Sequence, residues 1–73
     1  MRITYDGDGD TLSIILRNGK IEHAEDRGPI VANFDQRNRL IEIEILSASK
    51  VLGDFVAAVM RAKPNSKLVE VEI

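Results

Sequence analysis

Residues 30–49, with the sequence IVANFDQRNRLIEIEILSAS, constrain the fold more than any other part of this chain. An apolar run is followed by the polar turn at residues 35–38, a second strand pattern and a serine-flanked helix start. Within residues 40–46 isoleucine alternates with glutamate, which is the period of two expected for a strand with two different faces. The β-branched isoleucines also favour a strand over a helix. The segment therefore predicts two antiparallel strands that lead directly into a helix.

Three more strands are expected before this segment. Residues 2–5 and 11–16 alternate apolar and polar side chains on either side of an acidic turn at residues 6–10, so they are expected to pair as a hairpin. Asn18-Gly19 is the strongest two-residue turn signal in the chain, because both residues tolerate the positive φ of a type I′ turn. This turn predicts a third strand over residues 20–25, which is polar and therefore expected at an edge of the sheet.

A helix is expected after residue 46, with Ser47 or Ser49 as its N-cap, because a serine hydroxyl accepts a hydrogen bond from a free amide of the first turn. Residues 68–73 alternate again and predict a C-terminal strand. Together these elements predict an α+β fold: a two-layer arrangement in which an antiparallel meander of about five strands plus the C-terminal strand packs against one amphipathic helix. The helix residues expected to form the core stripe are Val51, Leu52, Phe55, Val56, Val59 and Met60.

Length and composition narrow the class of protein. A chain of 73 residues is enough for a single domain over residues 1–73, and a domain of this size buries only about 60% of its unfolded surface. Without cysteine it has no disulfide, no thiolate nucleophile and no cysteine metal site. Ten Lys and Arg against 12 Asp and Glu argue against binding to nucleic acid. With neither a signal-like start nor a membrane-length apolar run, we expect a soluble cytoplasmic protein.

Two motifs resemble a known family. Tyr5-Asp6 with Asp10-x-Leu12-x-Ile14, and the run RLIEIEILSAS at residues 39–49, resemble the small bacterial family called domain of unknown function 2283. Its members look like Y-D-x-x-x-D-x-L-x-I near the start and R-L-V-G-I-E-I-L-D-A-S later. The resemblance covers a family-like core at residues 2–52 and leaves out the helix continuation and last strand at 53–73.

The chain departs from the family pattern at two positions. Glu42 stands where the family usually has glycine, and Ser47 stands where it usually has aspartate. The resemblance implies the same sheet-and-helix fold and a bacterial or archaeal source, and it carries over no catalytic residue. Some members resemble the smaller partner in two-gene pairs of toxin and antitoxin type, which makes a second small protein a candidate partner.

The acidic turn resembles part of a calcium loop. Asp6, Asp8 and Asp10 occupy its first three ligand positions, but Thr11 stands where such a loop needs glycine and Arg17 where it needs a bidentate glutamate. A solvated hairpin turn is therefore the preferred interpretation.

Glu42 and Glu44 lie about 7 Å apart on one face of their strand and could bind a metal or act as an acid and base pair. No surrounding pattern supplies a pocket that would separate their pKa values. His23 is the only histidine and has no serine or carboxylate in a catalytic motif beside it. We expect no catalytic residue and no cofactor.

Apolar side chains exceed what one helix can cover. A helix packs on one face of a sheet, yet the predicted strands carry apolar residues on both, with Leu40 and Leu46 opposite Ile41, Ile43 and Ile45. Exposed apolar surface of this kind usually marks an interface. The expected interface residues are Leu12, Ile14, Leu16, Ile30, Phe34, Leu40, Leu46, Val69 and Val71.

These observations lead to two main hypotheses of different classes. The first is a non-enzymatic interaction module, either a homodimer or the partner of a second small protein, that binds through a sheet face or edge. The second is a carboxylate-based protein or enzyme that binds a divalent metal through the acidic turn and the two strand glutamates. Binding of metal to the native state would raise the melting temperature, which separates the two. A third, nucleic-acid binding through Arg37, Arg39, Arg61, Lys63 and Lys67, is placed last because the net charge of −2 disfavours it.

Overall fold

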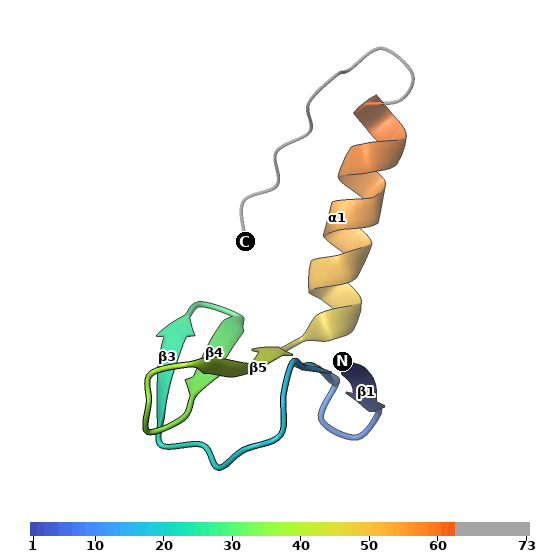
Figure 1. The fold of residues 1–73 in the computed structure, drawn as a ribbon. Coiled ribbons are helices and arrows are strands. Elements are labelled where there is room, and N and C mark those ends of the chain that lie inside the picture. Colours follow the sequence, from blue (N-terminus) through green and yellow to red (C-terminus); the bar gives the residue numbers. More distant parts are fainter. Residues whose placement is uncertain (63–73) are drawn as a thin grey trace.

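The computed structural model describes residues 1–62, and it confirms the predicted α+β fold with an antiparallel sheet and one helix (Figure 1). The predicted C-terminal strand at residues 68–73, with Val69 and Val71, lies outside the described residues. The elements are β1 (Arg2–Asp6), β2 (Thr11–Ile15), β3 (His23–Arg27), β4 (Ile30–Phe34), β5 (Leu40–Ile45) and α1 (Ala48–Ala62).

The strands lie in the order β1-β2-β5-β4-β3, with every neighbouring pair antiparallel. β5 is inserted between β2 and the β3–β4 hairpin, so the chain leaves β2 and crosses to the far edge of the sheet before β3 begins. The polar third strand is an edge strand, as expected, although it starts at His23 rather than at residue 20.

The predicted hairpin turn at Asn18-Gly19 is wrong. The strand beside β2 is the isoleucine-rich β5, which buries more apolar surface there than the polar residues 20–25 would. The backbone N–H of Leu16 donates to the carbonyl of Ile41 at 2.8 Å, so the chain stays beside β5 after β2 ends. The two-residue turn between β3 and β4 is instead Gly28-Pro29, with Gly28 at a φ of 60°.

Asp35 organises the turn between β4 and β5, where the sequence predicts a four-residue connection. Its carboxylate accepts hydrogen bonds from the backbone N–H groups of Arg37 and Arg39, both at 2.9 Å, and from the side-chain Nε–H of Arg39 at 2.8 Å. Asn38 adopts a φ of 59°, which asparagine tolerates better than most residues. The turn therefore closes by satisfying its own polar groups.

The register gathers the apolar residues of the central strands on one face. Ile43 lies opposite Ile14 in β2 and Ala32 in β4, and Ile45 lies opposite Leu12 and Ile30. Directly opposed residues share a face of the sheet. The alternation within β5 does not by itself indicate which residues of the neighbouring strands share a face with Ile43 and Ile45, because the pairing between strands decides this.

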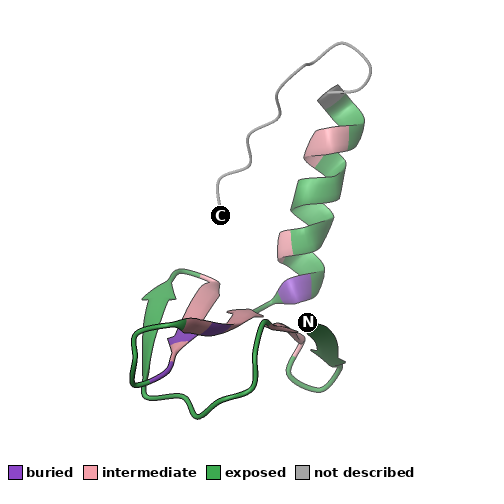
Figure 2. Cartoon of the chain, viewed as in Figure 1, coloured by how far each residue is buried: buried purple, intermediate pink, exposed green. Residues whose placement is uncertain are grey.

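A β-bulge in β5 interrupts the alternation of its side chains between the two faces at one end of the sheet. Asn33 pairs with Glu42 but Phe34 pairs with Leu40, so Ile41 is the additional residue. Leu40 is thereby opposite Phe34. Ile41 is 2% exposed and is one of two buried hydrophobic residues in the described part of the chain, the other being Ala48 (Figure 2).

Helix α1 extends away from the sheet and makes few contacts with the strands (Figure 1). Its first residue, Ala48, is buried, but most of the helix is exposed (Figure 2). Phe55 is 49% exposed and Met60 is 66% exposed. The interpretation of the helix stripe as packed core is therefore wrong for the described residues, because the helix is held at its base and directed away from the sheet.

Candidate interaction surface

The base of α1 is held by Asp10, at the end of the turn between β1 and β2. One carboxylate oxygen of Asp10, Oδ2, accepts the hydroxyl of Ser49 at 2.7 Å, and the other, Oδ1, accepts the backbone N–H of Ser49 at 3.0 Å and the hydroxyl of Tyr5 at 2.8 Å. The carbonyl of Asp10 accepts the N–H of Ala48 at 2.9 Å. The turn and the helix start are thus one hydrogen-bonded unit, which we call the helix anchor.

Ser47, one of the two predicted N-cap residues, directly precedes the helix, but Asp10 of the helix anchor supplies the capping carboxylate. The hydroxyl of Ser49 donates to Asp10 rather than capping the helix, and the carboxylate of Asp10 accepts the free first-turn amide. The carbonyl of Ser47 accepts the N–H groups of Lys50 and Val51 at 3.1 and 3.0 Å. A carboxylate at this end of a helix is also stabilised by the helix dipole.

The same hydrogen bonds shift two pKa values in opposite directions. The bonds from Ser49 and Tyr5 stabilise the ionised carboxylate and lower the pKa of Asp10 below its usual value. The hydrogen bond to Asp10 also stabilises the protonated phenol and raises the pKa of Tyr5 above its usual value. Both groups therefore keep their ordinary charge states, anionic and neutral, over a wider pH range than free side chains.

One face of the sheet is apolar across β1, β2, β5 and β4. Ile3 is opposite Ile14 and Tyr5 is opposite Leu12, so the outer strand β1 continues the face. Ile3 is 58% exposed and Tyr5 57% exposed, while the residues on the inner strands are half-buried. This apolar sheet face consists of Ile3, Tyr5, Leu12, Ile14, Ile30, Ala32, Phe34, Leu40, Ile43 and Ile45.

Strand β3 gives the apolar sheet face a polar rim. Its residues opposite β4 on this side are His23, Glu25 and Arg27. The His23 ring stacks on Phe34 with the ring centres 5.0 Å apart and the planes 9° from parallel. The lone histidine is thus part of the packing at the rim.

The opposite face of the sheet is largely polar. Asn33 and Glu44 project from it, and Nδ2 of Asn33 donates to Oε1 of Glu44 at 2.6 Å. Asn33 is buried and its side-chain amide has little contact with water, so the bond to Glu44 supplies the hydrogen-bond partner that this amide needs. Glu44 is therefore engaged in structure.

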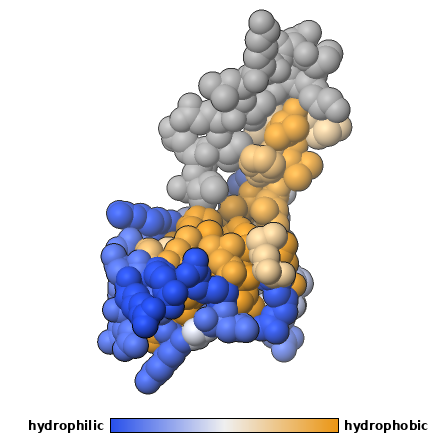
Figure 3. Space-filling view, in the orientation of Figure 1, coloured by the Kyte–Doolittle hydropathy of each residue, from blue (hydrophilic) through white to orange (hydrophobic). Residues whose placement is uncertain are grey.

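The helix carries a second apolar surface, which we call the helix stripe: Val51, Leu52, Phe55, Val56, Val59 and Met60. On the other side of α1, Nζ of Lys50 and Oδ2 of Asp54 form an ion pair at 2.8 Å. That pair raises the pKa of Lys50 above its usual value. The space-filling view shows apolar residues on both the helix and the sheet (Figure 3).

Most of the predicted interface residues belong to these surfaces or adjoin them. Leu12, Ile14, Ile30 and Phe34 lie on the apolar sheet face, as does Leu40 opposite Phe34. Leu16 and Leu46 directly follow the ends of β2 and β5, and each is 38% exposed.

The acidic candidates do not converge. Oδ1 of Asp6 accepts the N–H of Asp8 at 3.0 Å, Asp10 holds the helix anchor, and Glu44 accepts Asn33. Glu42 lies opposite Ile15 and Asn33. Within residues 1–62 no group of three or more His, Asp or Glu side chains is placed to hold a metal ion.

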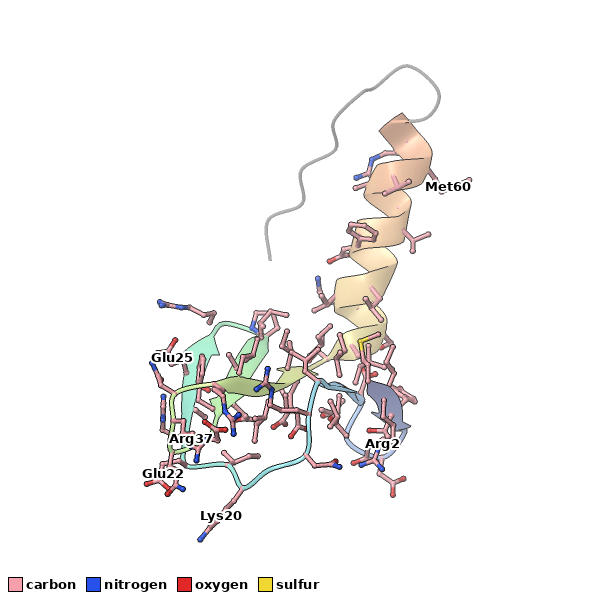
Figure 4. All side chains as sticks on the ribbon, viewed as in Figure 1. Arg2, Lys20, Glu22, Glu25, Arg37 and Met60 are labelled. Carbon is pink, nitrogen blue, oxygen red and sulfur yellow. The ribbon has the colours of Figure 1, made fainter. Side chains whose placement is uncertain are left out.

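A polar pocket of 260 Å³ lies beside the Asp35 turn. Lys20, Glu22, Asp35, Arg37 and Arg39 contribute to its lining. Glu22 and Arg37 lie at the same corner of the sheet, while Lys20 points away from it (Figure 4). Asp35 and Arg39 are already paired, and the turn's amides lower the pKa of Asp35 below its usual value, so these two of the five charged residues serve the turn.

The helix anchor brings together residues from both motifs recognised in the sequence. Residues 2–49 match the sequence model of the family described as Protein of unknown function (DUF2283). The chain belongs to this family. The match ends at Ser49, so in this DUF2283 protein it covers the five described strands and the helix anchor but none of the helix stripe.

No curated protein and no solved structure gives a significant match to this DUF2283 chain. Among residues 1–62 no helix is both long and apolar enough to cross a membrane.

Proposed function

We propose that this DUF2283 protein is a non-enzymatic interaction module that forms a homodimer through its apolar surfaces. The observation that carries the proposal is the apolar sheet face, which spans four strands while its residues stay half-buried or exposed among the described residues. A contiguous apolar face on a small domain usually marks an interface. A two-fold dimer is the simplest assembly that covers it.

The exposed side chains are numerous enough for their burial to matter. Six large apolar residues of the two surfaces are 39% to 66% exposed, and covering what remains exposed contributes roughly 1 kcal/mol each. The total of about 6 kcal/mol per chain is comparable to the whole folding stability of many small domains. The six are Ile3, Tyr5, Leu52, Phe55, Val56 and Met60.

The dimer leaves the edges β1 and β3 and the polar sheet face open to a second protein. Edge strands offer unpaired backbone groups to which another chain can add a strand. A second small protein, as in pairs of toxin and antitoxin type, would bind at these edges rather than at the apolar sheet face.

Native mass by light scattering over a range of concentrations tests the proposal. We expect a species of twice the chain mass of 8.1 kDa that dissociates on dilution. Ile3→Glu on the apolar sheet face should shift the equilibrium towards monomer, whereas Thr4→Glu, next to it on the polar face, should not. A wild-type chain that stays monomeric up to millimolar concentration would overturn the proposal.

A further inference from the structure

We propose that the homodimer forms by reciprocal helix exchange, with α1 of each copy lying across the apolar sheet face of the other. This inference rests on the proposed function and specifies which surfaces meet. It assigns the helix stripe, which makes few contacts with the strands of its own chain, a partner in the second copy.

The chain carries two apolar surfaces of the kind that normally pack on each other. Helices and sheets form a layered core when an apolar stripe covers an apolar face. Here the helix stripe and the apolar sheet face are both present, but Phe55 is 49% exposed and Val56 is 55% exposed. A second copy supplies a sheet for this helix and a helix for this sheet.

The dimensions of the two surfaces agree. A helix of 15 residues is about 22 Å long, and five strands spaced by about 4.8 Å extend about 19 Å from the first axis to the last. One helix therefore spans the sheet. A helix also satisfies its own backbone hydrogen bonds, whereas an extended segment laid on the same face would bring unpaired N–H and C=O groups onto apolar side chains.

The area needed for a stable dimer favours exchange over sheet-on-sheet packing. Strands of five residues are about 16 Å long, which gives the sheet face a flat footprint of about 300 Å². One side of α1 adds a footprint of about 200 Å². In exchange each chain buries one side of its helix and the strip of sheet beneath the partner's helix, about 400 Å² of flat footprint against about 300 Å² for sheet-on-sheet packing, so exchange comes closer to the roughly 800 Å² of accessible surface that each partner buries in a standard interface.

The helix anchor prepares the helix for this role. Ser49 bonds to Asp10 through its backbone and its hydroxyl, so the direction of the first turn is fixed before a partner arrives. Only Leu46 and Ser47 separate β5 from α1, which further limits the directions open to the helix. A preorganised element loses less conformational entropy on binding. Because the exchange is reciprocal, the copy that receives a helix gives its own helix to the same partner, and the assembly closes at two chains.

Two damaged variants that complement each other test the exchange. The sheet variant combines Ile3→Lys with Ala32→Lys on the apolar sheet face, and the helix variant combines Leu52→Glu with Phe55→Glu on the helix stripe. Each pair of charges is intended to remove its contact altogether. In a mixture, the sheet variant's intact helix meets the helix variant's intact sheet, and at the second contact lysine faces glutamate.

We expect each variant alone to dimerise at least 100-fold more weakly than the wild type, and the equimolar mixture to recover a species of dimer mass. The matched control for the sheet is Thr4→Lys with Ala24→Lys on the polar face. The control for the helix is Ala57→Glu with Arg61→Gln, which lie on the side of α1 away from the stripe and lower the net charge by the same amount. Both controls should dimerise as the wild type does. Recovery in the mixture also shows that both variants fold.

The outcomes separate this inference from the proposed function. A dimeric wild type in which only one variant is weakened, or in which the mixture recovers nothing, would overturn helix exchange and leave the homodimer standing. Assembly beyond two chains would overturn the closed exchange as well. A monomeric wild type would overturn both proposals.

Discussion

Ser49 donates two hydrogen bonds to the carboxylate of Asp10, one from its backbone N–H and one from its hydroxyl, across 39 positions of sequence. The contact joins the start of the only helix among residues 1–62 to the first hairpin. The hydroxyl of Tyr5 donates to the same carboxylate. One side chain, that of Asp10, thus links the helix start to both Tyr5 and Ser49.

Asp10→Asn should destabilise the fold. Asparagine tolerates the φ of 51° at this position and keeps the shape of the side chain, but it removes the charge that strengthens the bonds from Ser49 and Tyr5. We expect the melting temperature to fall by roughly 5 °C in a thermal scan followed by circular dichroism. Asp8→Asn in the same turn is the control and should melt as the wild type does.

Acid should weaken the fold in a specific pH range. The pKa values of Asp10 and Asp35 are lowered in the folded state, so the unfolded chain takes up protons at higher pH than the folded chain. Their contribution is therefore complete above about pH 5 and is lost as pH falls from about 4 through the lowered folded values. Urea unfolding at a series of pH values measures this loss. The deficit of Asp10→Asn relative to the wild type should shrink over the same range, and a constant deficit would contradict the assignment.

Tyr5 should ionise late. It is the only tyrosine and the chain has no tryptophan, so the near-ultraviolet absorbance of tyrosinate reports this residue alone. Its pKa is raised, hence we expect a midpoint above the ordinary value of 10.0 in the wild type and a lower midpoint in Asp10→Ala. Because the folded pKa is the higher one, this contribution to stability is complete below about pH 10 and is lost as pH rises through the folded value. Identical midpoints in the two proteins would show that the bond is not formed in solution.

The bulge residue Ile41 should tolerate truncation poorly. It is 2% exposed, and Ile41→Ala removes buried methyl groups and leaves a cavity, at a cost of about 2–4 kcal/mol in the free energy of unfolding. Ile3→Ala is the comparison, because Ile3 is 58% exposed and should cost less than about 1 kcal/mol in the monomer. Denaturant unfolding of both variants, at a concentration where the chain is monomeric, measures the difference.

Divalent metal should leave the melting temperature unchanged. The carboxylates of Asp6, Asp10 and Glu44 accept hydrogen bonds from separate groups of the fold, and they do not converge. Any ligand of the native state alone raises the melting temperature by mass action. A rise with millimolar calcium, magnesium or manganese would restore the metal-binding hypothesis.

Local patterns in the sequence predict local structure well. The alternation in residues 40–46 predicts β5, and the polar residues 35–38 predict the turn that Asp35 closes. Asn18-Gly19 suggests a hairpin, but the stability of a hairpin also depends on the apolar surface that its strands bury. The polar residues 20–25 would bury little if they paired with β2, and β5 takes that place. A turn sequence alone therefore does not determine which strands pair, because tertiary contacts can favour a different neighbour.

The candidate surface was only partly predictable for a related reason. Leu12, Ile14, Ile30 and Phe34 were expected at an interface, and the structure places all four on the apolar sheet face. Which face Ile43 shares with them depends on the pairing between strands. The single-residue shift at Ile41 has no signal in the sequence. Asp10 and Ser49 each stand in a recognisable motif, but nothing local indicates that they touch.

The strand order also bears on how the chain folds. β3, β4 and β5 are consecutive and pair through short turns, so this half can form with little loss of chain entropy. β2 must then find β5, bringing Leu12 to Ile45 over a long stretch of sequence. Contacts of such separation slow folding and form late. We therefore expect the bond between Asp10 and Ser49 to close last, so that a newly made chain can direct its helix towards a second copy only after its own sheet is complete.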